Sequence, residues 1–161
     1  MYEGKSQAVR FADGKSLQIK IPVGTESGQE IRLAGQGGEG SQGGPAGDLF
    51  LKVEFRAHPL FTLQHNDIYF NLPITPWEAA LGAKVTVLTL GGKVEVNIAA
   101  GSQSGQKLRL KGRGLPAKVH GDQYCVLQIM IPTADTEEAK ALYEKMAKEF
   151  TNFEPRSKLE K

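Results

Sequence analysis

The chain has 161 residues, 40% hydrophobic and 24% charged, which fits a soluble globular protein of one domain or two small ones. A net charge of only +2 argues against a protein whose main task is to grip DNA non-specifically, although local basic patches remain open. The single cysteine excludes an internal disulfide, the three histidines lack metal-ligand spacing, and no apolar run approaches the ~20 residues that cross a bilayer.

The first predicted strands belong to a pattern that occurs twice. "LQIKIPVGTESGQEIRLAGQG" begins at Leu17, and "VEVNIAAGSQSGQKLRLKGRG" begins 77 residues later at Val94. Each copy alternates apolar and polar residues with the period of two that is typical of a half-buried strand, and glycines recur where tight turns need positive φ. A further strand follows in each copy, "GDLFLKVEF" in the first and "GDQYCVLQI" in the second. We therefore expect two small β units in tandem, each with a thin core.

The second unit begins after His58-Pro59, which breaks the preceding strand. In "TPWEAALG" the sequence predicts a short helix with Thr75 as N-cap, Glu78 completing a capping box and Gly82 as the stop. The next segment, "AKVTVLTLGGKVEVNI", predicts a hairpin with a turn at residues 91–92.

A basic stretch follows in the second copy, with cations at every second position. Alternate positions of a strand share one face, so these side chains could meet DNA phosphates or an acidic chaperone tail. The competing interpretation is a solvated strand face, and the sequence leaves both open. A phosphate-binding P-loop is excluded because Gly105 is followed by Gln-Lys-Leu rather than Gly-Lys-Ser/Thr. The candidate anion or DNA contacts are Lys107, Arg109, Lys111 and Arg113.

After Pro132 the character changes, and "TADTEEAKALYEKMAKEF" predicts an amphipathic helix capped by Thr133 or Asp135. Its apolar stripe would either pack on its own domain or contact a second chain. The stripe residues are Leu142, Tyr143, Met146 and Phe150. The expected division is a first β subdomain at 1–57, incomplete at its N-terminus, a second at 58–132, the helix at 133–150 and a loose tail at 151–161.

Five segments together resemble a known family: "IPVGTESGQEIRLAGQG", "GDLFLKVEFRAHPLF", "DIYFNLPITPWEAALGAKVTVLTL", "AAGSQSGQKLRLKGRG" and "GDQYCVLQIMIP". In this order they resemble the C-terminal substrate-binding region of DnaJ-type co-chaperones, and most closely the curved-DNA-binding-protein branch that lacks a zinc finger. The helical J-domain with its His-Pro-Asp motif does not occur in the sequence, so this chain by itself is not expected to stimulate a partner ATPase. The first repeat also starts late, as a fragment would.

The resemblance implies a mainly β fold of two tandem sandwich-like or barrel-like subdomains, a C-terminal helix that forms a homodimer, and no enzymatic activity. It implies a module that holds unfolded or partly folded polypeptides by strand addition and an apolar groove, and delivers them to a DnaK-type chaperone. The alternative is a DNA-binding module that uses the basic strand 107–113. We expect no cofactor, no metal, no membrane partner and a cytoplasmic location, with nucleoid association if DNA is bound. By position, the groove residues are Val9, Phe11, Leu17 and Leu51, and burial in the core is their competing interpretation.

Overall fold

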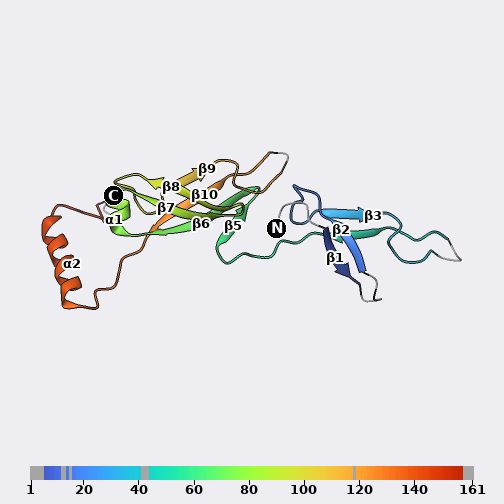
Figure 1. The fold of residues 1–161 in the computed structure, drawn as a ribbon, viewed down its shortest axis with the longest axis horizontal. Helices are drawn as coiled ribbons and strands as arrows, with labels where there is room; N and C mark the ends of the chain where they lie inside the picture. Colours follow the sequence, from blue (N-terminus) through green and yellow to red (C-terminus); the bar gives the residue numbers. More distant parts are fainter. Residues whose placement is uncertain (1–5, 12–13, 15, 41–43, 118, 158–161) are drawn as a thin grey trace. The chain divides into compact units, whose positions relative to one another are not determined.

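The computed structural model describes residues 6–11, 14, 16–40, 44–117 and 119–157. The chain forms two compact units, Met1–Ile129 and Met130–Lys161, and each is described by itself. The first is mainly β and the second carries the long helix, which confirms the expected fold class (Figure 1). The finer boundaries at residues 57 and 132 stay a prediction.

The first repeat consists of two antiparallel strand pairs. Val9 lies opposite Leu17 in the β1–β2 pair, and Ile31 lies opposite Leu51 in the β3–β4 pair. The period-two alternation predicted from the sequence therefore places apolar residues of paired strands on one face. The four strands are β1 (Ser6–Arg10), β2 (Ser16–Lys20), β3 (Glu30–Leu33) and β4 (Leu49–Lys52).

The second repeat contains a four-stranded sheet in the order β5-β6-β10-β9 and a separate β7–β8 hairpin (Figure 1). Strands β6 and β10 run parallel, while β5–β6 and β9–β10 are antiparallel. The strands are β5 (Phe61–Gln64), β6 (Asp67–Ile74), β7 (Ala83–Thr89), β8 (Gly92–Ile98), β9 (Lys107–Leu110) and β10 (Gln123–Ile129).

A closed apolar core joins this sheet, the hairpin and the short helix α1 (Pro76–Leu81). The strands contribute every second residue and α1 contributes its buried face, so the sheet, the hairpin and the helix pack around one core. The buried members of this cluster are Phe70, Leu72, Ile74, Ala79, Val87, Val96, Ile98, Cys125 and Leu127.

The helix and hairpin signals of the second repeat are borne out with one correction. Thr75 caps α1 through a capping box with Glu78, and Gly82 is the C-cap, as predicted. The hairpin turn lies at residues 90–91 rather than 91–92, because Thr89 pairs with Gly92 and donates its hydroxyl to the Gly92 carbonyl oxygen at 2.7 Å.

The two copies of the sequence repeat also form equivalent hydrogen bonds. Asp48 accepts from Arg32 Nε at 2.6 Å and from the Gly35 backbone N–H at 2.9 Å. The second copy forms the same pair of bonds, in which Asp122 accepts from Arg109 Nε at 2.6 Å and from the Gly112 N–H at 2.7 Å. Gly35 and Gly112 have φ of 66° and 67°, a left-handed conformation that glycine adopts without strain. The two aspartates therefore cap equivalent turns.

The second unit contains α2 (Glu137–Glu149), which begins later than its predicted caps. Thr136 is the N-cap, and its side chain accepts the Ala139 N–H at 3.1 Å. The prediction of Thr133 or Asp135 was wrong because these two side chains bond to each other, Thr133 donating to Asp135 Oδ2 at 2.5 Å. Thr133, Asp135 and Thr136 are all residues that can cap a helix, but only Thr136 directly precedes Glu137, the first helical residue.

Candidate functional site

The apolar residues of the first repeat are mostly half-buried. Val9 and Leu17 face the same side of the β1–β2 hairpin as Ile19, which is 4% exposed. Among the described residues up to 57, Ile19 is the only buried apolar side chain. The predicted groove residues Val9, Phe11, Leu17 and Leu51 are half-buried.

At two positions, the equivalent residues of the second repeat are fully buried. The repeat offset makes Leu51 equivalent to Cys125 and Val53 equivalent to Leu127. Cys125 and Leu127 are 0% and 1% exposed, whereas Leu51 and Val53 are half-buried. The two equivalent positions therefore differ in burial in the described residues.

The structure brings only part of the predicted groove together. Val9 and Leu17 are direct cross-strand partners, and Phe11 follows β1 by one residue. Leu51 belongs to the separate β3–β4 pair, opposite Ile31. The four residues thus come from two small sheets, and their role as a groove stays a prediction.

The basic stretch is shorter as a strand than the sequence suggests. Strand β9 ends at Leu110, and the turn at Gly112 interrupts the alternation, so Lys111 and Arg113 do not continue its face. The expectation of one strand at 107–113 with all four cations on one side is therefore corrected. Of the four, Lys107 and Arg109 lie on β9.

Arg109 has a defined structural partner. It forms an ion pair with Asp122, which raises the pKa of the guanidinium above its ordinary value, mainly through their side-chain hydrogen bond. The pKa of Asp122 is lowered, first by the hydrogen bond from the Gly112 backbone, while partial burial opposes this shift and Arg109 reinforces it. Because Arg32 and Asp48 repeat the ion pair in the first copy, the position belongs to the shared framework.

Sequence reasoning missed an aromatic pair on the outer face of the four-stranded sheet. Tyr69 and Tyr124 are cross-strand partners on β6 and β10, with stacked rings 5.1 Å apart between centroids. Lys107 Nζ lies 5.3 Å from the centre of the Tyr69 ring, a cation–π contact. The one signal available was that Phe50, the repeat equivalent of Tyr124, is aromatic as well.

The stripe on α2 is exposed. Leu142 and Phe150 are 69% and 63% exposed, and Met146 is exposed as well. Tyr143 is half-buried and donates its hydroxyl to the Pro132 carbonyl oxygen at 2.7 Å, so this residue ties the helix to its own leading segment. Of the four stripe residues, Tyr143 is therefore bonded within its own chain, and the other three expose apolar surface to solvent.

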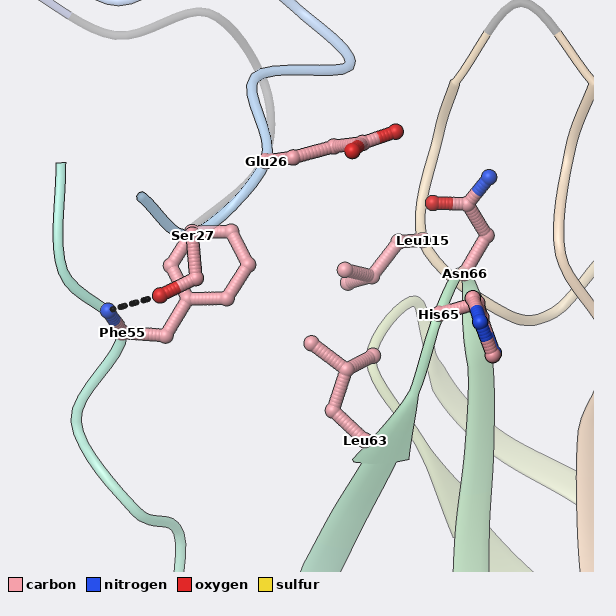
Figure 2. Close-up of a pocket in the computed structure, with 7 residues that line it drawn as sticks. All are labelled: Glu26, Ser27, Phe55, Leu63, His65, Asn66 and Leu115. Atoms are coloured by element: carbon pink, nitrogen blue, oxygen red, sulfur yellow. Dashed lines mark hydrogen bonds between the residues drawn. The ribbon is translucent and has the colours of Figure 1, made fainter. Parts of the chain in front are cut away.

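A cavity of about 310 Å³ lies within the first unit. Figure 2 shows the Phe55 backbone N–H donating to the Ser27 hydroxyl at 3.3 Å on one side of it. This bond is part of the repeat framework, because the Ile129 N–H donates to Ser104 at 3.5 Å in the second copy. The cavity is lined by Glu26, Ser27, Phe55, Leu63, His65, Asn66 and Leu115.

In the part of the chain that the structure describes, no group of three or more His, Cys, Asp or Glu side chains could hold a metal ion. Cys125 is buried, and burial raises the pKa of its thiol, which disfavours a reactive thiolate. None of the helices described is long and apolar enough to cross a membrane.

The chain is thus a protein of two tandem β repeats followed by an amphipathic helix. The model of the family described as "DnaJ C terminal domain" matches residues 1–132. The chain belongs to this family, which confirms the resemblance carried by the five sequence segments.

Similar curated proteins carry the name "Curved DNA-binding protein". The one from Coxiella burnetii (strain Dugway) is 53% identical over 145 residues, which cover 90% of this chain and 46% of the relative. The one from Salmonella paratyphi B is 48% identical over 143 residues, covering 88% of this chain and 47% of the relative. The chain therefore spans about half the length of the curated relatives it matches.

Proposed function

We propose that this chain is a client-binding module of a DnaJ-type co-chaperone. It holds unfolded or partly folded polypeptides on the apolar cluster of the first repeat and delivers them to a DnaK-type chaperone. Backbone hydrogen bonds to an added strand would be indifferent to client sequence, and the apolar cluster would select for hydrophobic segments. Membership of the DnaJ C-terminal domain family supports this proposal.

The observation that carries the proposal is the family match over residues 1–132, and the half-buried apolar residues of the first repeat are the candidate contacts. The second repeat buries nine apolar residues in one cluster, while the described part of the first buries Ile19 alone. Half-buried leucines on a folded β framework give a client apolar surface without requiring the module to unfold.

The test is suppression of aggregation of an unfolded reporter. Leu17→Ser and Leu51→Ser should reduce suppression severalfold, because each replaces half-buried apolar surface with a hydroxyl. The matched control is Leu81→Ser, which changes an apolar residue that is 79% exposed on α1. Equal loss of activity in the control, or full activity in both folded cluster variants, would contradict the proposal.

A second candidate function is DNA binding, favoured by the printed name of the relatives and by the cations near β9. Neutralising Lys107, Lys111 and Arg113 to Gln should weaken duplex binding and flatten its salt dependence, since each phosphate contact releases condensed counterions. Lys84→Gln/Lys93→Gln on the β7–β8 hairpin is the control. Duplex binding that is equally weakened by both sets would assign the effect to net charge alone.

We also propose that the chain acts as a homodimer through α2, with Leu142, Tyr143, Met146 and Phe150 at the contact. Exposure of three of these side chains supports it. Two shallow binding surfaces on one client would raise avidity without a deep pocket.

A further inference from the structure

The two faces of the four-stranded sheet in the second repeat differ in what covers them. On β6, Ile68, Phe70 and Leu72 enter the core, and the residues between them point to the opposite side. The strand register continues this outer face over β10 and β9. None of its central residues is buried, so this part of the face is open to solvent. These residues are Tyr69, Asn71, Lys107, Arg109, Tyr124 and Val126.

The charged groups of this outer face that reach solvent are cations. Lys107 forms no ion pair with any described residue, and Arg109 remains 59% exposed although it is paired with Asp122. The carboxylates at the end of the face are less exposed and already engaged. Asp122 accepts from Arg109 and from a backbone N–H, and Asp67 accepts the Asp122 N–H at 2.7 Å. An anionic ligand would therefore meet cations first.

The aromatic pair at the centre of the outer face offers hydroxyls rather than ring faces. Tyr69 and Tyr124 cover one face of each other, with an angle of 16° between the ring planes. Lys107 Nζ lies 5.3 Å from the centre of the Tyr69 ring, and Arg109 is the cross-strand partner of Tyr124. Neither phenol hydroxyl is hydrogen-bonded to another described residue. The rings are thus packed against their neighbours, and two hydrogen-bond donors remain for a ligand.

These groups have one chemical property in common, which is that all of them donate hydrogen bonds to anionic oxygen. An ammonium, a guanidinium and two phenol hydroxyls lie on one sheet face, with the exposed amide of Asn71 beside them. In protein–DNA complexes most hydrogen bonds go to phosphate and sugar, and Arg, Lys, Asn and Tyr side chains are among the donors. Because the ring faces are largely occupied, the arrangement favours contact with a phosphate backbone over stacking with bases.

We propose that the outer face of the four-stranded sheet binds the sugar–phosphate backbone of duplex DNA. Lys107 and Arg109 are the cationic contacts, and the hydroxyls of Tyr69 and Tyr124 donate to phosphate oxygens. The inference rests on the second candidate function given above and deepens it, because it places the contact on a sheet face and adds two uncharged residues to the cations. Binding should depend little on base sequence, since phosphate contacts carry no sequence information directly.

The first test removes the two hydroxyls and keeps the rings. The affinity of the full chain for a short fluorescent duplex of mixed sequence is measured by anisotropy at several salt concentrations. Tyr69→Phe/Tyr124→Phe should weaken binding about tenfold with an unchanged salt slope, because two hydrogen bonds are lost and no charge is removed. Lys107→Gln should instead lower the slope by about one phosphate contact. The control Thr86→Val removes an exposed hydroxyl on the β7–β8 hairpin and should bind as the wild type does.

The second test compares two variants of equal net charge. Asn71 on β6 lies on the proposed face, whereas Asn97 on β8 lies on the hairpin, and both are exposed. Asn71→Asp should weaken duplex binding severalfold more than Asn97→Asp does, because only the first places a carboxylate among the proposed contacts. Circular dichroism establishes that each variant is folded. Equal weakening by the two variants would overturn the proposal, as would full binding by the folded Tyr69→Phe/Tyr124→Phe variant.

The same measurements separate the face from the broader function. If the wild-type chain does not bind the duplex, the second candidate function is wrong, and the inference with it. If the chain binds the duplex and the tyrosine and Asn71 variants bind equally well, only the inference is wrong. Polyglutamate that binds this face more tightly than the duplex does would assign it to an acidic polypeptide and contradict the proposal. Tighter binding of the corresponding single strand than of the duplex would indicate base contacts and contradict it as well.

Discussion

At the scale of single residues, one carboxylate in each repeat accepts the hydrogen bonds that stabilise a turn. Asp122 accepts from Arg109 and Gly112, and its own backbone N–H donates to Asp67 Oδ1 at 2.7 Å, so it connects three segments of the second repeat. The Asp122 side chain is 13% exposed, against 26% for its counterpart Asp48. The same chemistry therefore operates in a less hydrated setting in the second repeat.

Asp122→Asn should lower the midpoint of urea unfolding at pH 7, and by more than Asp48→Asn does. The folded-state pKa of Asp122 is depressed, so its ionised form contributes stability above the unfolded pKa and loses it as pH falls through the folded value. The difference between wild type and Asp122→Asn should consequently shrink as the solution is acidified below the ordinary range of a carboxyl group. A difference that stays constant down to that range would assign the effect to lost packing rather than to charge.

At the scale of elements, α2 has a complete N-terminus and an exposed apolar stripe. Its first turn carries Glu137 and Glu138, and its last turn carries Lys148, a distribution that favours the helix dipole. The helix is thus locally well specified, while Leu142, Met146 and Phe150 remain exposed.

If the chain forms the homodimer proposed above, the triple variant Leu142→Ser/Met146→Ser/Phe150→Ser should be a monomer in light scattering. Apolar area removed from water is the driving force for such a contact, at roughly 25 cal/mol per Å². The control is Glu144→Gln/Lys148→Gln on the opposite face of α2, which should leave the mass unchanged. A triple variant that stays dimeric would place the interface elsewhere.

The elements also show how far the sequence predicts the fold. The caps of α1 were predicted because their signals are local in the sequence. The parallel pairing of β6 with β10 was not, because period-two alternation identifies the buried face of a strand but not its neighbour. The Tyr69–Tyr124 stack depends on that pairing and was missed with it.

At the scale of the whole molecule, two copies of one framework have different degrees of closure. The second copy contains β5, β6 and α1 and forms a sealed core, while the described part of the first lacks counterparts of these elements. The sequence indicated the duplication and the apolar residues of both copies. It did not reveal how the strands of each copy pair, because the apolar pattern identifies the buried face of a strand and not its neighbour.

Because the two repeats bury their leucines to different extents, truncating a leucine should destabilise the protein by different amounts in each. Leu127→Ala in the sealed core should cost about 3 kcal/mol, the usual range for a buried leucine, as measured by urea unfolding. Leu51→Ala in the half-open cluster should cost clearly less, because part of this side chain is already hydrated. Equal costs would mean that the first repeat is as tightly closed as the second.

The most direct test of the account is to map where an unfolded client contacts the labelled chain, residue by residue, by NMR. We predict that the signals of β1 to β4 shift or broaden on addition of a reduced, unfolded reporter, with Leu17, Phe50 and Leu51 among the most affected, while β7, β8 and β10 stay unchanged. Perturbation confined to the second repeat, or no perturbation at client concentrations where aggregation is suppressed, would contradict a client-binding role for the open first repeat.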